Sequence, residues 1–173
     1  MNWVAKKSYD ENGVIIGESK TYLDNIGREL QTQSRNFSTN SMLASQKIYD
    51  SFGRPSISTM AAPIYQNYFC YKTDFITANS GQVYDASKFD LEKTASNNIG
   101  EINNPFGIDN NDKGSLGWYF SDNNTEEPYV ASSNFPYSRI EYYADPLGRP
   151  KKLAGISENY KMGSDHETRV FYG

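Results

Sequence analysis

A short turn recurs along this chain and constrains its fold more than any other feature. Four copies of Asp-x-x-Gly occur, and arginine directly follows three of them. The aspartate side chain of such a turn accepts hydrogen bonds from nearby backbone N–H groups, and the glycine adopts a positive φ without a Cβ penalty. Each copy therefore predicts a hairpin with a glycine-closed loop. The turn residues are Asp10 and Gly13; Asp24, Gly27 and Arg28; Asp50, Gly53 and Arg54; and Asp145, Gly148 and Arg149.

A tyrosine accompanies every copy of the turn, but not at a fixed distance. Tyr9 and Tyr49 directly precede the aspartate, whereas Tyr22 and Tyr143 stand one residue earlier. Since successive strand side chains point to opposite faces, this shift sends the ring to the other face unless a bulge absorbs it. In the third hairpin Tyr49 would fall opposite Arg54, and we expect the guanidinium to stack on that ring.

The segments between the turns predict an all-β fold of consecutive antiparallel hairpins that form a curved sheet. Runs rich in β-branched and aromatic residues enter and leave the turns, as is typical of strands. We expect residues 1–64 and 138–173 to form the hairpins, the latter ending in a terminal strand over 168–172. Residues 65–137 lack the turn and are rich in Asn, Gly and aromatic residues, which predicts an irregular insertion laid on the sheet. Within it, residues 86–94 are the best candidate for a helix, with Ser87 as N-cap.

The Tyr-Asp-x-x-Gly-Arg pattern resembles the YD repeat of the Rhs family, which includes the C component of insecticidal toxin complexes and the teneurin shells. The stretches 114–119 and 135–139 are also similar to Rhs-type surface proteins of Bacteroidetes-like bacteria, so that the resemblance covers most of the chain. It implies strands that spiral into a hollow wall around a C-terminal toxin or effector. The expected partners are flanking YD repeats, the enclosed segment and the secretion machinery, at a secreted or cell-surface location.

The fourth turn reads Asp-Pro-x-Gly, which in the Rhs family marks the end of the shell, where a self-cleaving protease releases the cargo. In this chain Arg149 follows the glycine and strand-like residues lie on both sides. We therefore interpret this stretch as another YD turn and assign it no catalytic role.

The overall charge and hydropathy exclude several classes of partner. A net charge of −4 and a pI near 5.0 argue against nucleic-acid binding, which would require a basic patch. No apolar stretch approaches the roughly 20 residues of a membrane span. Residues 1–20 also lack the apolar core of a signal peptide, so we expect an export signal, and the parent protein's other repeats, outside this sequence.

No arrangement typical of an enzyme is evident. The lone His166 lies among turn-forming residues, and we interpret it as a loop histidine without a chemical role. The lone Cys70 is expected to be a small buried hydrophobe. No phosphate-binding loop and no zinc-ligand spacing occur, so we expect neither catalysis nor a cofactor.

Two sets of residues in the insertion are candidate binding sites. Asp109, Asn111 and Asp112 resemble a calcium loop, but Phe120 stands where an EF-hand has its bidentate glutamate, so we favour a solvated turn. A carbohydrate-binding surface would stack sugars on aromatic rings and satisfy their hydroxyls with Asp and Asn side chains. Aromatic residues in a sheet more often pack on one another, and we favour packing. The possible glycan contacts are Trp118, Tyr119, Asp122 and Asn124.

Overall fold

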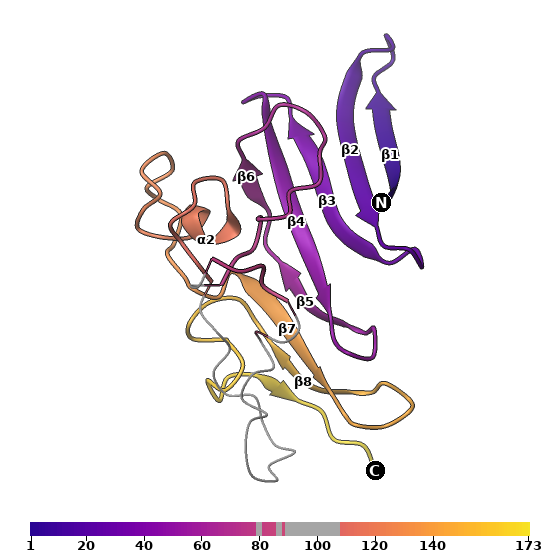
Figure 1. Ribbon diagram of the computed structural model, residues 1–173, viewed down its shortest axis with the longest axis vertical. Helices are drawn as coiled ribbons and strands as arrows, with labels where there is room; N and C mark the ends of the chain where they lie inside the picture. Colours follow the sequence, from indigo (N-terminus) through magenta and orange to yellow (C-terminus); the bar gives the residue numbers. More distant parts are fainter. Residues whose placement is uncertain (79–80, 86–87, 89–107) are drawn as a thin grey trace.

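The computed structural model of the chain describes residues 1–78, 81–85, 88 and 108–173. Its strands form one antiparallel sheet in the order β1-β2-β3-β4-β5-β7-β8-β9, with β6 beside β4 (Figure 1). The all-β, antiparallel prediction is therefore confirmed. The strands are β1 (Asn2–Tyr9), β2 (Ile15–Leu23), β3 (Glu29–Asn36), β4 (Ser41–Tyr49), β5 (Pro55–Thr59), β6 (Ala62–Ile64), β7 (Tyr137–Tyr142), β8 (Pro150–Ala154) and β9 (Thr168–Arg169).

The four predicted turns each join two neighbouring strands. Their glycines all have positive φ, from 62° at Gly148 to 85° at Gly27, a conformation that a residue with a Cβ seldom adopts. In each turn an aspartate oxygen accepts the backbone N–H of the residue two positions later, for example Phe52 to Asp50 at 3.0 Å. The hydrogen bonding that the sequence predicts is therefore present at all four turns.

Three of these turns lie at the same end of the sheet. They join β2 to β3, β4 to β5 and β7 to β8, whereas the β1–β2 turn lies at the opposite end (Figure 1). This follows from the antiparallel order, because the connection from β3 to β4 and the long connection from β5 to β7 return the chain to the same end each time. The side chains of three YD turns are thereby brought into one row.

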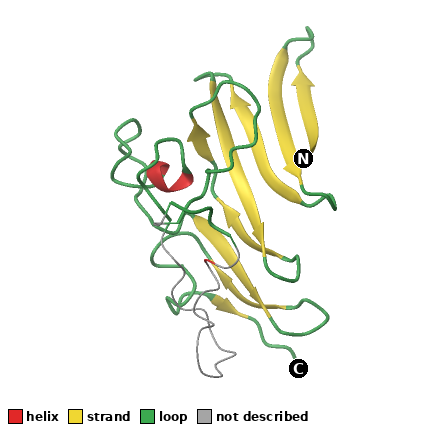
Figure 2. Cartoon of the chain, in the orientation of Figure 1, coloured by secondary structure: helices red, strands yellow, loops and turns green. Residues whose placement is uncertain are grey.

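One face of the sheet is covered and the other is left half-open. Along β4, Met42, Ala44, Gln46 and Ile48 are buried, and the residues between them are half-buried. Loops of the insertion pack over the central strands, and the short helix α2 (Leu116–Tyr119) lies beside β6 (Figure 2). Among the described residues, one hydrophobic cluster combines side chains of the sheet and of the insertion. The insertion contributes Phe75, Ile76, Ala78, Tyr84, Ile108, Leu116, Phe120 and Phe135.

The helix expected over residues 86–94, with Ser87 as N-cap, falls outside the described residues except for Lys88. The described α2 lies instead at 116–119, where the Ser115 side chain caps its start by accepting the Trp118 N–H. Gly117 allows α2 to approach the backbone at Asp109 closely, because a Cβ at residue 117 would lie 2.0 Å from the Asp109 carbonyl oxygen. Among the described residues, no helix has the length and apolar character needed to cross a membrane.

Candidate functional site

An ion pair closes each of the three turns that contain arginine. In the third turn, Arg54 Nε donates to Asp50 Oδ2 at 2.7 Å, while Asp50 Oδ1 accepts the Arg54 backbone N–H at 2.9 Å. The same aspartate thus fixes both the turn and the direction of the guanidinium. Equivalent side-chain contacts join Arg28 to Asp24 at 2.6 Å and Arg149 to Asp145 at 2.8 Å.

Each of these arginines stacks on a tyrosine from outside its own hairpin. Arg54 lies 4.4 Å from the ring centroid of Tyr142 on β7, and Arg28 lies 4.6 Å from that of Tyr49 on β4. The expectation that Arg54 stacks on Tyr49 within one hairpin is therefore wrong. The ion pair with the turn aspartate directs the guanidinium away from β4 and toward the strand on the other side of β5. The third contact of this kind places Arg149 4.7 Å from the Tyr172 ring.

The three contacts share one strand register. Arg28 lies three residues before Gln31, and Tyr49 lies three residues after Gln46, the strand partner of Gln31. Each arginine therefore stands directly opposite its tyrosine, at the end of the strand pair. Arg54 and Tyr142 have the same three-residue offset from the strand pair Ile57 and Arg139. Arg149 and Tyr172 have it from the strand pair Lys152 and Arg169.

The tyrosine hydroxyl adds a second link at two of these junctions. Tyr49 Oη donates to the Glu29 carbonyl oxygen at 2.8 Å, and Tyr142 Oη donates to the Pro55 carbonyl oxygen at 2.7 Å. In both cases the acceptor is the residue directly after the stacked arginine. We call this combination of arginine stacking and tyrosine hydrogen bonding the Arg–Tyr junction.

Tyr22 and Tyr143, which stand one residue further from the turn aspartate than Tyr9 and Tyr49, occupy other positions, each for its own reason. Tyr22 is 5% exposed on the covered face, edge-on to the Tyr71 ring at 5.6 Å, and Leu23 takes the position equivalent to Tyr49. The face change expected for Tyr22 is therefore confirmed. In the fourth turn the loop spans residues 143–149, against 50–54 in the third, so that Tyr142 and not Tyr143 ends the strand. Tyr143 instead donates through its hydroxyl to the Val170 carbonyl oxygen at 2.8 Å.

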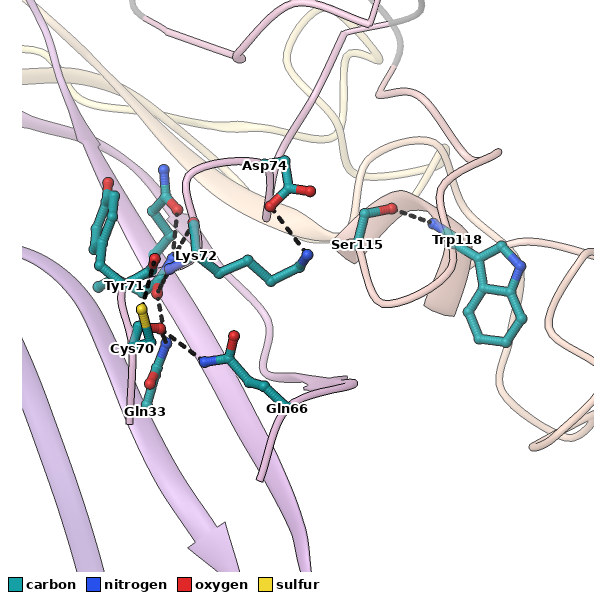
Figure 3. A network of polar contacts seen from close by, with 10 residues as sticks. Gln33, Gln66, Cys70, Tyr71, Lys72, Asp74, Ser115 and Trp118 are labelled. Atoms are coloured by element: carbon teal, nitrogen blue, oxygen red, sulfur yellow. Dashed lines mark hydrogen bonds and ion pairs between the residues drawn. The ribbon is translucent and has the colours of Figure 1, made fainter. Parts of the chain in front are cut away.

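Buried glutamines attach the insertion to the sheet, a feature that the sequence analysis missed. Gln33 Nε2 donates to the Cys70 carbonyl oxygen at 2.6 Å, and Gln31 exchanges two hydrogen bonds of 3.0 Å with the Lys72 backbone (Figure 3). Gln31 also donates to Gln46 across the strands. The signal was the alternation of glutamine with other residues in β3, since burial requires a polar side chain to find partners.

The Cys70 side chain is exposed, which contradicts the expectation that this residue is a buried hydrophobe. The hydrogen bond from Gln33 to its carbonyl oxygen holds the Cys70 backbone against the sheet, and the Cys70 Sγ lies 3.9 Å from the Tyr71 carbonyl oxygen. The other lone residue, His166, is also exposed, with its ring edge-on to Tyr160 at 5.9 Å.

A cavity of about 420 Å³ lies between the β3–β4 connection, the end of β6 and α2. It brings together three of the four candidate glycan residues, namely Trp118, Tyr119 and Asn124, whereas Asp122 is exposed outside it. The complete lining consists of Asn36, Thr39, Ser41, Leu43, Pro63, Ile64, Tyr65, Trp118, Tyr119, Asn124, Glu126 and Glu127.

The three candidate residues that line this cavity already have partners. Trp118 is 8% exposed and lies edge-on to Tyr65, with ring centroids 6.1 Å apart. The Asn124 side chain donates to the Tyr119 carbonyl oxygen at 2.8 Å and accepts the Glu127 N–H at 3.0 Å. Trp118 is therefore a packed residue, which is the alternative that the sequence favoured over glycan binding.

Carboxylates dominate the charge of the cavity wall. Glu127 accepts a 2.7 Å hydrogen bond from Tyr119 Oη, and burial together with this carboxylate raises the pKa of Tyr119 to about 12. Glu126 accepts hydrogen bonds from Tyr65 Oη and Lys113 Nζ, and the Lys113 contact chiefly lowers its pKa. Both tyrosine hydroxyls therefore serve as donors, which leaves the cavity rich in hydrogen-bond acceptors.

The calcium candidate does not form a cluster of ligands. Asp109 is buried and its Oδ1 accepts the Asn111 backbone N–H at 2.9 Å, whereas Asn111 and Asp112 are exposed. The Asp112 carbonyl oxygen accepts the Ser115 N–H in the turn that leads into α2. No group of three or more His, Cys, Asp or Glu side chains in the described part of the chain is placed to hold a metal ion.

Comparison of the sequence with protein-family models and with curated proteins finds no match in either.

Proposed function

We propose that this chain is a non-catalytic segment of a secreted or cell-surface wall of YD repeats, of the Rhs type, that encloses a C-terminal toxin or effector. The observation that carries the proposal is the Arg–Tyr contact, which recurs three times with the same register offset, twice to the last residue of a neighbouring strand and once to Tyr172, which follows β9. A contact that fastens each hairpin to the next can be repeated along a growing sheet. It provides what a wall of many hairpins needs, and it uses no residue arrangement suited to chemistry.

The open edges of the sheet support the same proposal. Among the described strands, β1 pairs only with β2 and β9 pairs only with β8, and every residue of β1 is exposed. Strand edges with free N–H and C=O groups invite pairing with further strands. Flanking YD repeats are the partners that would cover these edges, and the right-handed twist of the strands would curve the extended sheet around an interior.

The two faces of the sheet would then have different roles. The insertion covers one face, and we propose that the uncovered face lines the interior and meets the enclosed segment. Lys47, which alternates with the buried residues of β4, lies on the uncovered face and pairs with Glu29. Lys113 lies on the insertion, with its side chain 52% exposed. These two lysines are therefore matched reporters for the two faces.

Lysine cross-linking with mass spectrometry tests this proposal in a longer protein that contains the chain and a following C-terminal segment. We expect cross-links between Lys47 and the C-terminal segment and none from Lys113, and we expect no turnover of any substrate. Cross-links that favour Lys113, or a C-terminal segment as protease-sensitive as the same segment expressed alone, would refute enclosure by this wall.

A second candidate function is saccharide binding in the cavity. The observation that favours it is the grouping of Trp118, Tyr119 and Asn124 around one space of about 420 Å³. Glu126 and Glu127 would accept hydrogen bonds from sugar hydroxyls, with Tyr119 as an apolar wall. A Trp3→Phe variant leaves Trp118 as the sole tryptophan reporter. A saturable change in its fluorescence with a bacterial or host polysaccharide, lost in the additional variant Glu127→Ala, would favour this function, and no response would eliminate it.

A further inference from the structure

The free edge of β1 carries one half of an Arg–Tyr junction. Tyr9 is the last residue of its strand, stands next to a register shift and directly precedes a turn aspartate, as Tyr49 does. Tyr142 likewise ends its strand beside a register shift. The residues that pair with these three tyrosines each directly follow the turn, namely Ile15, Pro55 and Pro150.

Tyr9 differs from the other two in having no cation over its ring among the residues that the structure describes. It is 56% exposed, whereas Tyr49 and Tyr142 are half-buried beneath Arg28 and Arg54. Tyr9 belongs to the outermost strand of the sheet (Figure 1), so the position opposite its ring lies beyond the edge.

The chain direction places Tyr9 where an added strand would begin. β1 ends at Tyr9, so an antiparallel strand paired to its free edge would start beside this residue. In the two complete junctions the arginine likewise directly precedes the strand that pairs with the tyrosine's strand, since Arg28 precedes β3 and Arg54 precedes β5.

We propose that the edge of β1 binds an antiparallel strand that begins directly after an Asp-x-x-Gly-Arg turn, with the arginine stacked on Tyr9. That this strand belongs to a flanking YD repeat rests on the function proposed above. The offset of three residues in the existing junctions sets the register, so that the third residue after the arginine pairs with Lys6. Backbone hydrogen bonds supply most of the binding, and the arginine selects the register.

A peptide that copies residues 24–34 of this chain tests the proposal, because it contains a complete turn, the arginine and the strand that follows. The Trp118→Phe variant of the full chain leaves Trp3, which lies on β1 and is 56% exposed, as the only tryptophan. Titration of the peptide should produce a saturable shift in Trp3 emission. The peptide with Arg28→Ala should bind about two- to fivefold more weakly, the range expected for an exposed cation–π contact.

The protein variant Tyr9→Ala should weaken binding of the unmodified peptide by the same factor, and should add no further loss with the Arg28→Ala peptide. Tyr129→Ala is the matched control, since this tyrosine is fully exposed and lies on the insertion. It should leave the affinity unchanged. Thermal unfolding followed by circular dichroism checks that both variants are folded, as expected for exposed positions.

Absence of a saturable shift would overturn strand binding at β1. Binding that is indifferent to both Arg28→Ala and Tyr9→Ala would overturn the assigned register. Neither result depends on the Lys47 cross-links, so failure of this inference is distinguishable from failure of the proposed enclosing wall.

Discussion

Replacing Arg54 with alanine should lower the free energy of unfolding by about 2–3 kcal/mol, since it removes an ion pair, a hydrogen bond and the stacking on Tyr142, besides a longer contact of 5.0 Å with the Phe52 ring. The ion pair with Asp50 joins side chains that are 23% and 10% exposed, and contributes about 1 kcal/mol. The 3.2 Å hydrogen bond to the Tyr143 carbonyl oxygen and the stacking on Tyr142 contribute about 1 kcal/mol each. These terms share one guanidinium and are not strictly additive, which sets the expected total at or below their sum.

Urea denaturation of a double-mutant cycle separates the stacking from the other contacts. Combining Arg54→Ala with Tyr142→Leu should reveal a coupling of about 0.5–1.5 kcal/mol. The matched cycle pairs Arg54→Ala with Tyr49→Leu, and its coupling should be near zero because Tyr49 stacks under Arg28. Equal couplings in the two cycles, or a larger one with Tyr49, would refute the assignment of the contact to neighbouring hairpins.

Three further predictions concern the turns and the buried glutamines. Gly53→Ala and Gly13→Ala should each cost about 1–2 kcal/mol of stability in thermal denaturation, because both glycines have a φ of +78°, and the loss should be larger at Gly53, where a Cβ would meet another side chain. Gln31→Leu should cost about 2–4 kcal/mol and speed hydrogen exchange of the Lys72 amide, which loses its buried acceptor. The pKa of Asp145 lies below its usual value, chiefly because the arginine four residues later donates a hydrogen bond to the carboxylate. The stability from this pair should therefore be complete above pH about 4 and decline as the pH falls through the folded-state pKa, and Asp145→Asn should flatten that decline in acid denaturation.

The candidate glycan residues show that sequence spacing can group only residues that lie close together along the chain. Trp118, Tyr119 and Asn124 lie within seven residues of one another, and α2 together with the Asn124 hydrogen bond to the Tyr119 carbonyl oxygen brings them to one cavity. Apart from Glu126 and Glu127, the rest of the lining comes from the β3–β4 hairpin and the end of β6, more than fifty residues earlier in the chain. No local pattern could have located Thr39 or Leu43 beside Trp118, because their proximity depends on how the insertion folds back over β4. For the same reason the exposure of Cys70 could not be read from its residue type, since Gln33, a distant residue on β3, binds its carbonyl oxygen.

The sequence by itself determined the four turns and the all-β character of the chain. An Asp-x-x-Gly turn is held by hydrogen bonds within five residues and by one glycine at positive φ, so its geometry is encoded locally. Only the tertiary structure decided which ring each arginine contacts. Arg54 could reach a ring on either neighbouring strand, and the choice of Tyr142 over Tyr49 required β7 to lie beside β5 after a long insertion. A contact between strands that are distant in sequence depends on the order and register of the whole sheet, and no segment of the chain contains that information alone.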